Sequence, residues 1–192
     1  MQVGKKILQG KQTQKVLAFY KPVGVTCTER DPHAEKKIMD MIRYPERLTY
    51  AGRLDKDSEG LILLTNDGDL INVMMRGANR HEKEYIVKTD REITPDFLEK
   101  MAKGIYLKDL DITTRECEIE QIGKFTFRIV LTQGVNRQIR RMCEACGYRV
   151  KALKRIRIMN ILLGDLKPGK WREVTGEELE QLQRDTGMLN RN

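Results

Sequence analysis

The apolar run "GLILLTNDG", residues 60–68, is the part of the sequence that most constrains the fold. Its four consecutive apolar residues end at an Asn-Asp-Gly turn signal, which predicts a buried strand closed by a turn. Three acidic residues come just before it: Asp55, Asp57 and Glu59. In a chain of formal net charge +8, carboxylates therefore gather at the entrance to the core. Spacing alone leaves two interpretations open, a surface turn or a carboxylate held at the mouth of a cleft.

Strand and helix patterns are mixed along the chain without a strict βαβ rhythm. Apolar patterning predicts further strands within residues 16–24, 83–89, 116–122, 125–132, 148–158 and 169–175. Helices are predicted within residues 31–42, 69–76, 94–104, 136–147 and 176–185, the third capped by Thr94 and the fourth ended by Gly147. The mixture favours an α+β fold on a largely antiparallel sheet. We expect one unit over residues 15–192, two halves sharing one sheet, after a basic arm at residues 1–14.

Composition narrows the classes of function. The chain has 36 Lys and Arg residues against 28 Asp and Glu, which favours an anionic partner such as nucleic acid. Between Arg137 and Arg157, eight basic residues accompany one acid, Glu144, a pattern typical of phosphate binding or of solvated helix and strand faces. No window has the roughly 18 apolar residues of a membrane span, and no secretory signal is evident. We therefore expect a cytoplasmic protein with four reduced cysteines.

The acidic stretch matches part of a calcium-loop pattern. The first, third, fifth and sixth positions of that pattern are filled by Asp55, Asp57, Glu59 and Gly60. The last ligand position, where the pattern needs a bidentate Glu, is Asn66, and the segment continues as a strand instead of a helix. A calcium-loop interaction protein is therefore a remote alternative.

Cysteine and histidine patterns do not support a zinc site. Cys143 and Cys146 form a lone CxxC on an amphipathic helix, without a second pair. The segment "HEKEY" has Tyr85 where a zinc-protease helix needs its second histidine. Because glycine-rich phosphate loops and dinucleotide fingerprints are also missing from the sequence, we expect no cofactor and no metal.

Three blocks, in order, resemble one enzyme family. "GRLDKDSEGLILLTNDG", "KEYIV" and "GVNRQIRRMCEACGY" closely resemble the pseudouridine synthases of the RsuA and RluB/RluE/RluF branch; "YKPVGV" and "GKWREVT" fit as well. The resemblance spans about residues 16–175 and is greatest to the RluF-type enzymes of large-subunit ribosomal RNA. It implies the pseudouridine synthase catalytic fold, with flanking helices and a central cleft, and isomerisation of uridine in RNA without cofactor or metal. Many members carry an S4-type domain ahead of this unit, whereas 15 residues precede Val16, so we expect that domain to be absent.

The resemblance also implies roles for individual residues. Asp55 is similar to the catalytic carboxylate, Tyr85 to the aromatic ring that packs on the target base, and Arg140 to the ion-pair partner of the carboxylate. Arg53 matches a family arginine near the flipped-out nucleotide, while Asp57 receives no role. The further residues expected to bind substrate are Asn136, Arg137, Gln138, Arg141, Lys154, Arg155 and Arg157.

The chemistry of the reaction accounts for these residue types. Rearranging a glycosidic bond needs an ionised carboxylate, and a guanidinium would keep Asp55 charged and oriented. Extruding a base from RNA costs about a few kcal/mol, which stacking on Tyr85 would offset. We expect a monomer acting on structured RNA, first a 23S ribosomal RNA loop and also a tRNA anticodon stem-loop. The alternative from another class is a non-catalytic RNA-binding module.

Overall fold

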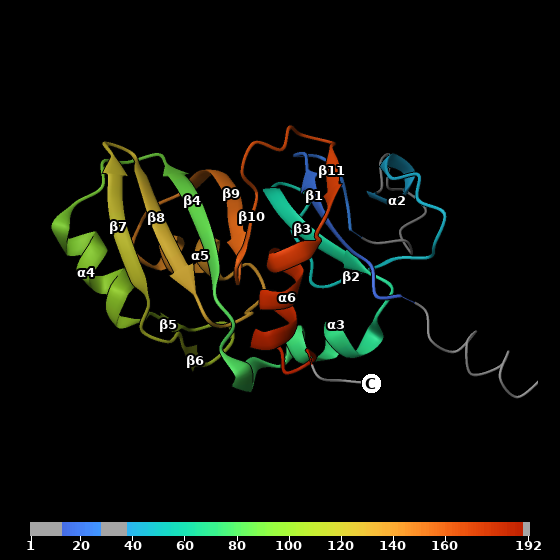
Figure 1. The fold of residues 1–192 in the computed structure, drawn as a ribbon. Helices are drawn as coiled ribbons and strands as arrows, with labels where there is room; N and C mark the ends of the chain where they lie inside the picture. The colour runs from blue at the N-terminus through green and yellow to red at the C-terminus, as the bar shows by residue number, and fades with distance from the viewer. Residues whose placement is uncertain (1–12, 28–37, 190–192) are drawn as a thin grey trace, which may run out of the picture.

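One mixed sheet runs through the computed structural model, which describes residues 13–27 and 38–189 (Figure 1). Its strand order is β11-β1-β3-β9-β4-β8-β7. These strands are β1 (Val16–Lys21), β3 (Glu59–Thr65), β4 (Lys83–Thr89), β7 (Glu118–Gly123), β8 (Thr126–Leu131), β9 (Val150–Ile158) and β11 (Trp171–Glu173). Short strands β2 (Thr49–Tyr50) and β10 (Ile161–Leu162) pair with β3 and β9, and β5 (Tyr106–Leu107) pairs with β6 (Ile112–Thr113) as a separate ribbon.

The pairing pattern confirms the α+β class and the largely antiparallel sheet. Among the described strands, only β3 and β9 pair in parallel, through Glu59 with Lys154 and Gly60 with Arg155. This short junction joins the strands β11-β1-β3 to the strands β9-β4-β8-β7. Gly60 has φ +116° there, and a Cβ atom would lie 2.2 Å from the carbonyl oxygen of Arg155. Only glycine allows this backbone conformation and this close approach.

The helices begin and end near the positions that the sequence predicts. They are α2 (Ile38–Met41), α3 (Gly68–Met75), the 3-10 turn η1 (Gly77–Asn79), α4 (Pro95–Lys103), α5 (Gln138–Ala145) and α6 (Gly176–Asp185). Thr94 caps α4 by accepting a hydrogen bond from the backbone N–H of Phe97, and Gly147, at φ +81°, follows the end of α5. Most of the helix predicted within residues 31–42 and most of the basic arm lie outside the described residues, so the division into arm and catalytic domain stays a prediction.

Hydrophobic clusters cover both faces of the β1–β3 pair. Residues of α3 and α6 pack on one face, and a second cluster containing Leu48 and Leu54 packs on the other. Leu61, Ile62, Leu63 and Leu64 are therefore all fully buried, as the apolar run predicts. A third cluster packs α4 and α5 against β4, β8 and β9. Figure 1 shows α3 and α6 beside one half of the sheet and α4 and α5 beside the other.

Candidate active site

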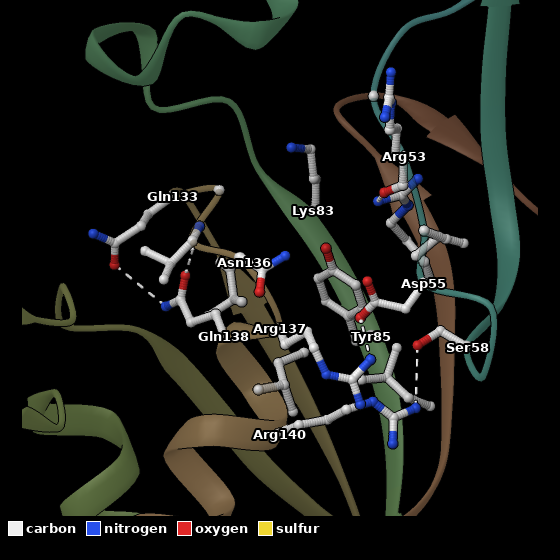
Figure 2. A pocket seen from close by; sticks show the side chains of 18 of the residues that line it. Arg53, Asp55, Ser58, Lys83, Tyr85, Gln133, Asn136, Arg137, Gln138 and Arg140 are labelled. Atoms are coloured by element: carbon white, nitrogen blue, oxygen red, sulfur yellow. Dashed lines mark hydrogen bonds and ion pairs between the residues drawn. The ribbon is translucent and has the colours of Figure 1, made fainter. Parts of the chain in front are cut away.

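A cleft of about 510 Å³ lies where the two halves of the sheet meet (Figure 2). Its lining comes from residues 50–58, the last turns of α3, the start of β4, residues 131–140 and the middle of β9. The predicted site residues in this lining are Arg53, Asp55, Tyr85, Asn136, Arg137, Gln138, Arg140 and Arg155. Three others, Arg141, Lys154 and Arg157, are not part of it. The fold therefore brings together residues from four segments that are far apart in the sequence.

The loop that carries Asp55 is fixed by buried groups behind it. Leu54 packs in a hydrophobic cluster, and its backbone exchanges hydrogen bonds with the Cys27 thiol, at 3.2 and 3.4 Å. The backbone N–H of Ser58 donates to the carbonyl oxygen of Asp55 at 3.1 Å, which closes a tight turn. The Asp55 side chain itself is 34% exposed and faces the cleft (Figure 2). The carboxylate is thus aimed by the fold and still open to a substrate.

Lys21 is a buried cation beneath the same loop. Its Nζ donates to the carbonyl oxygens of Pro22 and Val25, both at 2.7 Å, and of Lys56 at 3.4 Å. Burial lowers the pKa of Lys21 to about 8, because the charged form is poorly solvated. The amino group ties the end of β1 to the residue that follows Asp55, a support that the "KPVG" turn did not predict.

Two arginines of the α5 segment reach the acidic turn. Arg137 Nη1 lies 3.2 Å from Asp55 Oδ2, and the same guanidinium donates to both oxygens of Asp57 at 3.1 and 3.0 Å. Arg140 Nη1 lies 3.4 Å from Asp57 Oδ2, while its Nη2 donates to the Asp57 carbonyl and to Ser58 Oγ, both at 3.2 Å. The hydrogen bond from Arg137, together with the charge of Arg140, holds the pKa of Asp57 below its ordinary value.

These contacts correct the expected ion pair. Asp55 pairs with Arg137, and within the described residues Arg140 makes its ion pair with Asp57 instead. Arg137 precedes α5 in a left-handed conformation, φ 52°, which turns its side chain toward the mouth of the cleft. The Arg140 side chain extends from the first turn of α5 and contacts the backbone of the acidic turn. The order of the two arginines along the helix thus decides which carboxylate each one reaches.

Tyr85 and two cations, Lys83 and Arg155, complete the lining near the carboxylate. Tyr85 lines the same cleft as Asp55 (Figure 2). Lys83 lies two residues earlier on β4, and its ammonium has no hydrogen-bond or ion-pair partner among the described residues. Burial, with the nearby charge of Arg155, lowers the pKa of Lys83 to about 8. Sequence analysis missed Lys83, although its place in the "KEY" block could have identified it.

Two of the arginines expected to contact RNA are otherwise engaged. Arg155 is only 3% exposed; its Nε donates to the Leu61 carbonyl at 2.8 Å and its Nη1 to the Arg53 carbonyl at 3.4 Å. Arg157 Nε donates to Glu84 at 2.8 Å, and its Nη2 pairs with Glu82 at 3.2 Å. The expected phosphate contact of Arg155 is therefore corrected to a supporting role, because the side chain is buried and two of its nitrogens donate to backbone carbonyls.

The remaining basic candidates differ in their surroundings. The ammonium of Lys154 lies 5.9 Å from the centre of the Tyr20 ring, outside the cleft lining. The Arg141 guanidinium donates to the backbone carbonyl oxygen and to the side-chain Oδ1 of Asn136. These bonds support the loop before α5. Arg53 is exposed at the edge of the cleft (Figure 2). It is therefore the predicted arginine best placed to meet a phosphate.

The acidic turn does not form a calcium loop. Asp55 and Asp57 are engaged by arginine, and Glu59 accepts a hydrogen bond from the Tyr20 hydroxyl at 3.0 Å. The chain then continues directly into β3. Over residues 13–27 and 38–189, no three His, Cys, Asp or Glu residues are grouped as a metal site, and no helix has the length and apolar character to cross a membrane.

A partly exposed carboxylate, an aromatic ring and several cations line one cleft, an arrangement typical of an enzyme active site. The chain belongs to the RNA pseudouridylate synthase family, whose model matches residues 15–145. The pseudouridine synthase fold expected from the sequence is confirmed by a solved pseudouridylate synthase structure, with a TM-score of 0.83 at 28% identity over 90% of this chain and 75% of that one.

Two curated relatives make the similarity more specific. The chain is 47% identical over 167 residues to the dual-specificity RNA pseudouridine synthase RluF of Escherichia coli (strain K12), covering 87% of this chain and 57% of that protein. It is 34% identical over 177 residues to the ribosomal large subunit pseudouridine synthase B of Vibrio cholerae, covering 88% of this chain and 54% of that protein. The chain thus spans a little over half the length of these relatives.

Proposed function

We propose that this protein is an RNA pseudouridine synthase. The reaction breaks the C1′–N1 bond of a uridine, turns the uracil and joins C1′ to C5; C5 then loses its proton, and N1 gains one. The observation that carries the proposal is the Asp55 carboxylate, which lines the same cleft as Tyr85 and forms an ion pair with Arg137. A non-catalytic RNA-binding module would have no need for such a positioned carboxylate.

Each residue has a role that follows from its chemistry. Asp55 attacks carbon or takes a proton as a carboxylate, and its ion pair with the guanidinium of Arg137 orients it in the cleft. Tyr85 stacks on the extruded uracil, a contact typically worth about 1–3 kcal/mol. Arg140 holds the turn that carries Asp55 through its bonds to Asp57 and Ser58.

We infer that the substrate is a structured loop of large-subunit ribosomal RNA. The names of the two relatives support this: one acts on the ribosomal large subunit, and the other has dual specificity. A tRNA stem-loop is the second substrate we propose. Because one chain supplies the whole cleft lining, we propose a monomer, and because its substrate is ribosomal RNA, a cytoplasmic location.

Incubation of the purified chain with a ribosomal RNA transcript tests the function directly. We expect pseudouridine at one uridine, detected by chemical labelling and primer extension. Total RNA from cells with and without the gene then identifies the natural position. A transcript and a cellular RNA pool that both stay unmodified would reject the proposed activity.

Replacing Arg53 by Ala should weaken RNA binding and reduce its salt dependence. Arg53 is exposed at the edge of the cleft, so loss of one phosphate contact releases fewer counterions. The negative slope of log affinity against log salt should become shallower by about 0.7–0.9. Arg91→Ala is the matched control, because Arg91 is exposed beyond the opposite end of β4. Equal slopes for the two variants would place the RNA away from Arg53.

RNA affinity should decrease as the pH rises from about 7 to about 9. The pKa of Lys83, about 8, lies within this range, so the cleft loses a positive charge as the pH increases. The decrease should be smaller in Lys83→Met, measured by binding titrations at constant salt. Lys21 also has a pKa of about 8, but both proteins contain it and the comparison cancels its effect. Identical pH profiles would mean that Lys83 does not contact the RNA.

A further inference from the structure

We propose that Asp57 is a positioning residue for the reaction, which holds the guanidinium groups of Arg137 and Arg140 so that one oxygen of Asp55 stays open to substrate. The inference rests on the proposed function and deepens it. The family resemblance gives Asp57 no role, yet among the three acidic residues of this segment Asp57 has the most arginine contacts.

The hydrogen-bond geometry favours Asp57 as the residue that orients Arg137. Both terminal nitrogens of Arg137 donate to the two oxygens of Asp57, at 3.1 and 3.0 Å. Arg137 and Asp55 form an ion pair whose shortest separation is 3.2 Å, from Nη1 to Oδ2. A two-point guanidinium–carboxylate pair fixes direction as well as distance. Asp57 therefore determines the orientation of Arg137, and within the described residues Asp55 Oδ1 accepts no hydrogen bond from an arginine.

The charges of the site are balanced by the same arrangement. Two carboxylates, Asp55 and Asp57, face two guanidinium groups, Arg137 and Arg140. Without the charge of Asp57, Asp55 would be the carboxylate that remains in contact with Arg137. A carboxylate bound by guanidinium at both oxygens has less electron density to offer a carbon or a proton. The second carboxylate therefore keeps the first one reactive.

The pair also joins the two walls of the cleft. Asp57 lies on the turn closed by the bond from Ser58 N–H to the Asp55 carbonyl, and Arg137 immediately precedes α5. The two residues are 80 positions apart in sequence. Their contact holds Arg137 in its left-handed conformation, φ 52°, which is costly for a residue with a side chain. The distance between the catalytic carboxylate and α5 is thus fixed at this point.

Asp57→Asn tests the inference. The single-turnover rate of pseudouridine formation and the affinity for RNA are measured separately. We expect the single-turnover rate to fall about 10- to 100-fold, a loss typical of a displaced reacting group, while RNA binding does not weaken. Asp57→Glu should recover part of the rate, because it keeps the carboxylate. Glu59→Gln is the control from the same segment, since Glu59 bonds to Tyr20 and not to arginine, and it should react at nearly the wild-type rate.

A second comparison tests whether Asp57 acts through Arg137. In the Arg137→Gln background, Asp57→Asn should slow the reaction much less than in the wild type, because the two residues work as a pair. Equal slowing in both backgrounds would overturn the inference, as would an unchanged rate in Asp57→Asn alone or a loss explained by weaker RNA binding or a lower melting temperature. Wild-type protein that forms no pseudouridine would instead reject the proposed function.

Discussion

Asp55→Asn is expected to abolish pseudouridine formation and to leave RNA affinity nearly unchanged. The amide keeps the size of the carboxylate but neither attacks carbon nor takes a proton at neutral pH. Loss of a nucleophile or base of this kind lowers turnover by about a thousandfold or more. RNA binding should survive, because its free energy comes mainly from cations and from stacking.

Product formation and RNA binding must be measured on the same preparation. Single-turnover assays with excess protein report the chemical step, and binding titrations report affinity. Asp165→Asn is the matched control, since Asp165 is exposed on a loop outside the cleft lining, and it should behave like the wild type. Turnover by Asp55→Asn would contradict the catalytic assignment. A large loss of affinity would make Asp55 an RNA-binding residue.

Gly60→Ala should destabilise the fold by about 3 kcal/mol or more. The added Cβ would meet the Arg155 carbonyl oxygen at 2.2 Å and its backbone nitrogen at 2.6 Å, in a conformation, φ +116°, that disfavours any side chain. Because these atoms belong to the backbone, the clash can be relieved only by separating β3 from β9. That parallel pairing joins the two halves of the sheet and lies beside the cleft.

Chemical denaturation provides the measurement for Gly60→Ala. The unfolding midpoint should move to a clearly lower denaturant concentration. Gly68→Ala is the control, because Gly68 begins α3 with open space around it and a normal backbone conformation, so its free energy of unfolding should change little. A midpoint equal to that of the wild type would mean that the sheet absorbs the clash at no cost.

Local patterns predicted much of the fold. The seven strands on the main path of the sheet, the caps of α4 and α5 and the buried run Leu61–Leu64 follow from periodicity and from turn residues, which act over a few neighbours. The short strands β2, β5, β6 and β10 were not predicted. The parallel contact of β3 with β9 could not be predicted, because strand order depends on packing between distant segments.

The sequence predicted which residues line the site better than it predicted which of them contact one another. Asp55 and Tyr85 do meet in one cleft, but which arginine reaches Asp55 depends on how α5 lies against the acidic turn. Alternation on β9 predicted an exposed basic face, whereas strand pairing places Arg155 inside. Lysine is seldom buried, so no local rule would have predicted the position of Lys21.

Tyr85 packs against the α4–α5 cluster and also against the cluster beneath the Asp55 loop. The surface on which the uracil would rest is therefore a shared wall of two hydrophobic interiors, with little freedom to shift unless one of them loosens. On heating, activity should accordingly be lost at the temperature at which the whole chain unfolds, and not at a lower one.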